Sequence, residues 1–262
     1  MSATESNNLE FFLGGHDLEM LVISDLIREV APDRLHDKNL RWGARASDYE
    51  TEIEACLSEG RTPVLIELEN DLALDPACAL VIVDHHGPRA GRDNPTSLHQ
   101  VFDLLRLSAE RWTRWMELVA ANDRGYIPAM IDAGASRDEL EEVRRLDRSA
   151  QGITDEEESL AEQSLKTVET LASGRLTVVR LPHSRTAAVT DRLDLGGTGY
   201  ENLLVVSPSE VNFFGAGRLI QSLDRAFPGG WSGGALPERG FWGHPAVDSE
   251  KVISFLLSKL PA

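Results

Sequence analysis

Asp84, His85 and His86 are the residues whose types and spacing most directly suggest chemistry, since they follow the apolar run Ala79–Val83 without interruption. A short run of Val, Ile and Leu predicts a buried strand. Ligand sites of open parallel sheets gather at the carboxyl ends of the strands, and three polar side chains at such an end are costly to bury without a partner. Taken alone, the triplet is equally compatible with a capping Asp followed by two surface histidines.

Carboxylates and a further histidine occur near the ends of two other predicted strands, Leu9–Leu13 and Pro63–Leu68, and at the end of a predicted helix. These residues are His16, in a glycine-rich turn that favours a role at a site, and Asp17, Glu19, Glu67 and Asp123. Converging carboxylates repel one another unless some stay protonated or a cation neutralises them. Carboxylate and imidazole ligands suit manganese, magnesium or zinc. The pattern therefore predicts a divalent metal site, and two ions about 3.5–4 Å apart would suit in-line phosphoryl chemistry.

The elements that must position these residues alternate between short apolar runs and helical patterns. Apolar residues at helical spacing predict helices over Met20–Val30, Asp48–Glu59 and Leu98–Ala121, the last interrupted at residues 122–125. Strands that alternate with helices, and are apolar on both faces, are typical of a parallel sheet covered on both sides. We therefore expect an α/β fold with a mostly parallel sheet flanked by helices, followed by a smaller α/β C-terminal domain.

Changes in composition along the chain predict three parts. Ser136–Glu169 is densely charged and has no proline, which is typical of a solvated helical connector without a chemical role. The expected boundaries are residues 1–135 for the first domain, 136–172 for a helical linker and 173–262 for the C-terminal domain. In this last part we expect strands at Leu176–Leu181 and Leu203–Val206, the second extended by Val211–Phe214, then a helix at Leu219–Phe227 and a glycine-rich loop at Pro228–Gly243.

Composition limits the class of protein. The 262 residues include 43 acidic and 26 basic ones, for a formal charge of −17. Such a surface would repel long duplex DNA, whose binding needs clustered Lys and Arg, but it admits a small anion in a pocket whose charge is set by metal ions. The longest apolar run is far shorter than the ~20 residues of a membrane span, and the two cysteines favour a reducing compartment. We expect a cytoplasmic protein with a small anionic substrate and no membrane or duplex DNA partner; a homodimer stays open.

The segment Val83-Asp84-His85-His86 after an apolar strand resembles the signature of the DHH phosphoesterase superfamily. Acids elsewhere are similar to the family's other motifs, in the family's order; these are Asp17-x-Glu19, Glu67 and Asp123. The C-terminal part is similar to the family's companion domain, in which a Val-x-Phe segment and a helix lead to a glycine-rich loop. The resemblance covers nearly the whole chain.

This resemblance implies a two-lobed hydrolase that holds one or two metal ions, usually manganese, in its first lobe and cleaves phosphoester or phosphoanhydride bonds. The metal ligands that it implies are Asp17, Glu19, Glu67, Asp84, His85 and Asp123. Asp84, His85 and His86 would carry catalysis, with His86 facing the substrate phosphate. Gly233 and Gly234 would close over the other end of the substrate.

Two arginines are further candidates for contact with a phosphate. Arg89 follows His86 by three residues, and Arg218 lies close to the Val-x-Phe segment. The alternative for Arg89 is an exposed arginine in a loop, and for Arg218 it is a residue that caps a helix.

The sequence departs from the family pattern at several positions. Leu13 stands where members usually have His, and Glu19 and Glu67 stand where Asp is usual. The glycine-rich loop lacks the expected His, and Phe214 replaces an Arg. We expect a metal-dependent phosphoesterase that hydrolyses a small, nucleotide-derived anion by two-metal activation of water. Two alternatives stay open: a divergent enzyme for a non-phosphate substrate, and a non-catalytic binding protein with a degraded metal site.

Overall fold

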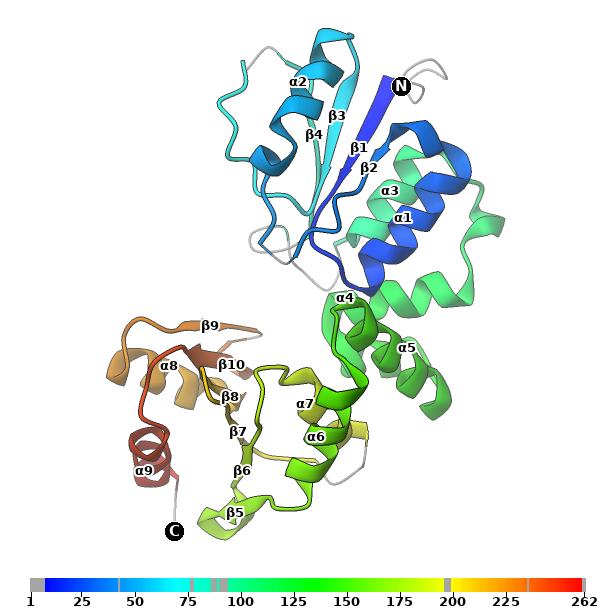
Figure 1. The fold of residues 1–262 in the computed structure, drawn as a ribbon. Coiled ribbons are helices and arrows are strands. Elements are labelled where there is room, and N and C mark those ends of the chain that lie inside the picture. The colour runs from blue at the N-terminus through cyan, green and yellow to red at the C-terminus, as the bar shows by residue number, and fades with distance from the viewer. Residues whose placement is uncertain are drawn as a thin grey trace. The chain divides into compact units, whose positions relative to one another are not determined.

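The computed structural model describes residues 8–41, 43–75, 78–85, 89, 94–195, 199–234 and 236–260 (Figure 1). The chain divides into two compact units, Met1–Gln151 and Gly152–Ala262. The division falls inside the segment 136–172, so that helix α5 (Arg137–Ala150) belongs to the first unit and helix α6 (Asp155–Leu165) to the second. No helix in the described ranges is both long and apolar enough to cross a membrane.

The first unit is built on a parallel sheet, as the sequence predicts. Its strands, in the order in which they lie side by side, are β2 (Leu35–His36), β1 (Leu9–Leu13), β3 (Thr62–Ile66) and β4 (Val81–Val83). The neighbouring strands all pair in parallel. β1 is buried along its whole length, because helices cover both faces of a parallel sheet. β2 has only two residues, too few for a recognisable pattern.

Helices lie on the two faces of this sheet (Figure 1). They are α1 (Leu18–Val30), α2 (Glu50–Ser58) and α3 (Ser97–Leu104), while α4 (Arg114–Asp132) and α5 pack against α1 and against each other; 3₁₀ turns lie at Pro32–Arg34, Ala46–Tyr49 and Ala109–Arg111. On the α2 side, Tyr49 and Ile53 pack against Phe12 of β1 and Leu65 of β3. α1 and α3 pack against each other on the other side.

The helix expected over Leu98–Ala121 is wrong in its extent. The structure has two helices there, α3 and α4, separated by the 3₁₀ turn Ala109–Arg111. The interruption expected at residues 122–125 is present as a kink inside α4, where Tyr126 has a φ of +64°. Asp123 therefore lies in the last regular turn before the kink.

The second unit has a mixed sheet in the order β5-β6-β7-β8-β10-β9. The strands are β5 (Glu169–Leu171), β6 (Leu176–Arg180), β7 (Leu203–Val206), β8 (Val211–Ala216), β9 (Trp231–Gly233) and β10 (Arg239–His244). The helices are α6, α7 (Ala187–Leu195), α8 (Gly217–Ala226) and α9 (Ser249–Lys259), with a 3₁₀ turn at Ala172–Gly174. β8 does not extend β7 as expected, since the chain turns at Ser207–Glu210 and pairs back in antiparallel.

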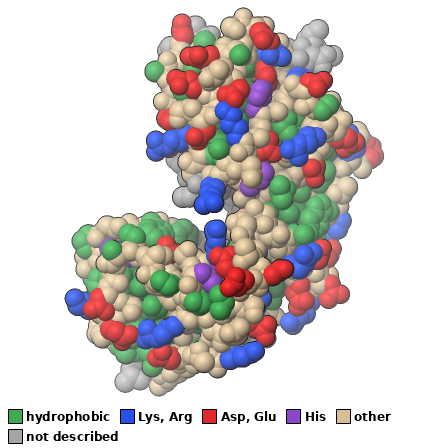
Figure 2. Space-filling model, in the orientation of Figure 1, with side chains coloured by type: hydrophobic (Ala, Val, Ile, Leu, Met, Phe, Trp, Pro, Cys, Tyr) green, Lys and Arg blue, Asp and Glu red, His purple; other side chains and the backbone are tan. Residues whose placement is uncertain are grey.

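The glycine-rich segment of the second unit forms the β9–β10 hairpin. Trp242 is fully buried and packs with Leu219 and Leu223 of α8. Trp231 and Phe241 are about two-fifths exposed. On the face of the molecule drawn in Figure 2, Lys and Arg side chains are scattered among acidic ones rather than gathered into one patch.

Candidate metal centre

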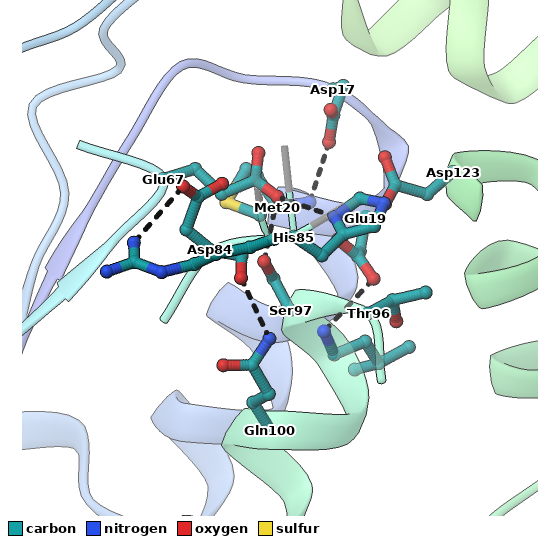
Figure 3. Close-up of polar contacts among 12 residues, drawn as sticks. Asp17, Glu19, Met20, Glu67, Asp84, His85, Thr96, Ser97, Gln100 and Asp123 are labelled. Carbon is teal, nitrogen blue, oxygen red and sulfur yellow. Dashed lines mark hydrogen bonds and ion pairs between the residues drawn. The ribbon is translucent and has the colours of Figure 1, made fainter. Parts of the chain in front are cut away.

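Four side chains from separate segments converge at the carboxyl edge of the first sheet (Figure 3). Glu19, Glu67, His85 and Asp123 each offer one ligand atom, and these atoms all lie within 4.8 Å of one another. Glu19 lies in the first turn of α1, after β1. Glu67 follows β3 directly, and His85 follows β4 by two residues. Asp123 comes from α4. Because the strands run in parallel, their carboxyl ends lie at the same edge of the sheet. Residues that are distant in sequence are therefore close together there.

His85 lies between two of the carboxylates and is almost completely buried. Its Nε2 is 2.9 Å from Oδ2 of Asp123, and its Nδ1 is 3.6 Å from Oε1 of Glu67. Burial by itself lowers the pKa of His85, but its contacts with Asp123 and Glu67 and the charges of Asp123 and Glu19 outweigh it and raise the pKa to about 10. In the metal-free protein the imidazole is therefore protonated at neutral pH and offsets part of the carboxylate charge. A cation must displace this proton to bind His85.

Glu19 is the most deeply buried carboxylate of the group, with 2% of its surface exposed. Its Oε1 accepts a hydrogen bond of 3.0 Å from the backbone N–H of Leu98. Its Oε2 is buried and has no hydrogen-bond partner among the described residues. Burial, and then the charges of Asp123 and Glu67, hold the pKa of Glu19 well above its ordinary value.

The start of α3 supports two of these carboxylates. Ser97 Oγ donates a hydrogen bond of 2.8 Å to Oε1 of Glu67, and the next residue, Leu98, holds Glu19. A helix N-terminus carries a partial positive charge that favours carboxylates. Sequence reasoning missed Ser97; the signal for it is the Pro95-Thr96-Ser97 segment before an apolar helical pattern, which is typical of a helix start.

Asp17 and Asp84 lie beside the group but outside its 4.8 Å limit. Asp17 caps α1, where its Oδ1 accepts a hydrogen bond of 2.8 Å from the N–H of Met20. Its pKa is raised well above the ordinary value by burial and by the charges of Glu67 and Asp123. Asp84 pairs through Oδ2 with Nη1 of Arg89 at 3.4 Å.

The remaining candidates lie in other surroundings. His16 is held by Asp37, whose Oδ1 is 2.8 Å from its Nε2. His86 lies outside the described residues. Arg218 is exposed on α8 of the second unit. Gly233 ends β9, and Gly234 has a φ of +102° with its Cβ position 2.6 Å from Cα of Gly240, so a side chain is excluded there.

The group fits a divalent cation. It combines carboxylate oxygens with one imidazole, a donor set that manganese, magnesium and zinc accept. The buried Oε2 of Glu19 is costly without a partner, and coordination would satisfy it. Burial first, and then the charges of neighbouring carboxylates, raise the pKa values of Asp17 and Glu19. A cation would offset these charges.

Gly14 makes the close approach of β1 and β3 at this edge possible. A Cβ on Gly14 would lie 2.5 Å from the carbonyl oxygen of Glu67 and 2.7 Å from that of Ile66. Both are backbone atoms and cannot rotate away. Glu67 itself has a φ of +50°, so its backbone has little freedom to adapt.

We expect Gly14→Ala to lower the free energy of unfolding by about 2–4 kcal/mol, because overpacking displaces the strand ends. It should also weaken manganese binding, because Glu67 moves with its carbonyl. Urea unfolding and calorimetric titration with manganese check both effects. Gly60→Ala is the control, since its Cβ position is open and only its φ of +73° is unfavourable. Equal manganese affinity in the two variants would contradict this role of Gly14.

Solved structures with the same fold support the resemblance that the sequence indicates. The DHH domain of a member of the s1p family of ribosomal proteins superposes with a TM-score of 0.56 at 14% identity, covering 99% of this chain and 89% of that one. An exopolyphosphatase-related protein from Bacteroides fragilis superposes with a TM-score of 0.53 at 11% identity, covering 95% and 92%. No family model matches the sequence, and no curated protein matches it. The chain thus has the fold of the DHH-domain proteins.

Proposed function

We propose that this protein is a metal-dependent phosphoesterase that hydrolyses a small anionic, nucleotide-derived substrate. The observation that carries the proposal is the convergence of Glu19, Glu67, His85 and Asp123, from four separate segments, around a buried carboxylate oxygen that has no hydrogen-bond partner in the described part of the chain. The fold supports it, because the chain shares its architecture with an exopolyphosphatase-related protein. The departures from the family pattern are the reason to consider a non-phosphate substrate or a purely binding role, but the shared fold and the converging ligands favour the phosphoesterase.

Those four residues would hold the cation. We propose that this cation is manganese. We assign Asp17 and Asp84, which the family resemblance also gives as ligands, to a second ion. When bound, the metal supplies an activated water and positive charge for the phosphoryl oxygens.

The chain's own residues prepare this chemistry. Ser97 and the Leu98 amide fix the orientation of Glu67 and Glu19, so both carboxylates are preorganised. His85 holds a proton that it must release before it can bind metal. Beside the group, Arg89 carries a charge that suits a substrate phosphate.

Other contacts with substrate follow from the family resemblance alone. We assign His86 to the substrate phosphate. We assign Gly233, Gly234 and Arg218 of the second unit to the other end of the substrate. The absence of side chains at the two glycines suits a close approach of ligand to backbone.

The test is a hydrolysis panel with purified, manganese-loaded protein. It contains bis-p-nitrophenyl phosphate, linear dinucleotides, cyclic dinucleotides and pyrophosphate, each assayed with and without a chelator. We expect manganese-dependent hydrolysis of at least one of them and none by Asp123→Asn. Asp132→Asn, an exposed acid on the same helix, is the control and should keep full activity. If every substrate is inert while manganese is bound, the proposal fails.

A further inference from the structure

A buried ion pair on α5 connects α1 and α4, the helices that carry two of the candidate metal ligands, Glu19 and Asp123. Arg144 is fully buried and Asp147 is 4% exposed. Arg144 Nη1 donates to Oδ2 of Asp147 over 2.7 Å. Both residues belong to the charged stretch Ser136–Glu169 for which the sequence predicts a solvated surface without a chemical role. None of the motifs discussed above includes them.

Asp147 reaches the start of α1. Its second oxygen, Oδ1, accepts a hydrogen bond of 3.2 Å from the backbone N–H of Leu18. Leu18 stands between Asp17, which caps the helix, and Glu19, which belongs to the metal-binding group. Gln151 donates to Oδ2 of the same carboxylate over 2.9 Å and fixes its orientation from the other side.

Arg144 reaches the kink of α4. The same Nη1 donates over 2.7 Å to Oδ1 of Asn122, the residue before Asp123. Its Nη2 donates to the hydroxyl of Tyr126, and its guanidinium carbon lies 3.7 Å from the centre of that ring. Tyr126 has the unfavourable φ of +64° that ends the regular part of α4. Arg144 therefore holds the segment 122–126 on both sides of Asp123.

These contacts position α1 and α4 relative to each other rather than increase the stability of the protein. An ion pair this deeply buried contributes little net stability, because the desolvation of both charges offsets their attraction, and well-packed apolar residues often do as well. What apolar residues cannot do is fix a backbone amide on one helix and a kink on another in defined directions. Metal sites depend on that kind of support.

We propose that Arg144 and Asp147 are positioning residues that set the distance between Glu19 on α1 and Asp123 on α4, and so tune the affinity of the metal centre. This inference rests on the proposed function. Their hydrogen bonds reach the backbone and side chains next to the group. They act through Leu18 and Asn122, which directly precede Glu19 and Asp123, and through Tyr126 at the kink that follows Asp123.

The test separates affinity from stability by replacing both partners together. In the double variant Arg144→Met, Asp147→Leu, apolar side chains fill the space that the ion pair occupies in the wild type. We therefore expect a melting temperature near that of the wild type. We expect its Kd for manganese, from calorimetric titration of the full chain, to rise 10- to 100-fold, as is usual when outer support of a metal site is lost. Val143→Ala, a buried apolar change in the same helix, is the control; it should lower the melting temperature and leave the Kd within twofold.

Tyr126→Phe provides an independent second variant, because it removes only the hydroxyl that Arg144 holds and keeps the ring. Its Kd should also rise, by about threefold to tenfold, without a matching loss of melting temperature. Wild-type Kd values in the double variant, or in Tyr126→Phe if the double variant does not fold, overturn the inference while leaving the proposed function intact. A wild type that binds no manganese overturns both.

Discussion

Glu19→Gln is expected to stabilise the metal-free protein by about 1–3 kcal/mol and, at the same time, to abolish metal-dependent hydrolysis. A charged Glu19 is unfavourable in the folded protein, because it is buried among other carboxylates, and its pKa is raised for this reason. The neutral amide of Gln avoids this cost. Its oxygen can still accept the hydrogen bond from Leu98, and its –NH₂ can donate to neighbouring carboxylates. Without an anionic ligand the metal affinity should fall at least a hundredfold, because such a centre depends on charged donors.

Urea unfolding in the presence of a chelator measures the first effect, and calorimetric titration with manganese measures the second. Glu29→Gln is the matched control: it lies on the same helix, but its side chain is 65% exposed and paired with Arg111. That variant should change stability by less than about 0.5 kcal/mol and leave manganese binding alone. A Glu19→Gln protein that is less stable than the wild type, or that binds manganese equally well, would contradict our description of the centre.

The free energy of unfolding of the metal-free protein is expected to fall as the pH rises from 7 to 9. The pKa of His85 is raised from an ordinary value of 6.5 to about 10; burial opposes the shift, and Asp123 and Glu67 cause it. A raised histidine pKa contributes stability that is complete below pH 6.5 and is lost as the pH rises through about 10. The raised pKa values of Asp17 and Glu19 have the same sign of effect as the pH rises through their own titration ranges.

Each proton that the folded state binds in excess gives a slope of about 1.4 kcal/mol per pH unit. Urea unfolding at pH 7, 8 and 9 with a chelator measures this slope. It should be smaller in Glu19→Gln, because the charge of Glu19 helps to raise the pKa of His85, and unchanged in Glu29→Gln. Saturating manganese should reverse the trend, since the cation competes with protons and binds more tightly as the pH rises. Stability that is constant or increases with pH in the metal-free wild type would show that the carboxylates are not crowded as the structure indicates.

The sequence predicts those parts of the fold that depend only on the local pattern of apolar residues. β1 and β7 begin and end where the apolar runs do, because strands buried on both faces are mostly apolar; the one exception, Glu10 of β1, is buried and paired with His36 and Arg61. Glu19, Glu67, His85 and Asp123 were all singled out, since each lies at the end of a recognisable element. That they lie together depends on the parallel order of the strands, which the alternation of strands and helices already predicts.

The sequence does not predict contacts between distant segments when neither segment has a recognisable local pattern. Asp37, which holds His16, follows a strand of only two residues. Arg144 and Asp147 stand among many charged residues, and no local feature distinguishes a buried arginine from its solvated neighbours. Only the packing of α5 against α1 and α4 makes that difference.

The most direct test of the central claim is a crystal structure of the manganese-loaded protein, with diffraction data collected at the absorption edge of manganese. We expect an anomalous peak within coordination distance of Glu19, Glu67, His85 and Asp123. One ring nitrogen of His85 should coordinate the ion. The matching crystal of Glu19→Gln should show that peak lost or strongly reduced. A manganese-soaked wild type in which His85 still pairs with Asp123 and Glu67, with no peak among these four residues, would contradict the account.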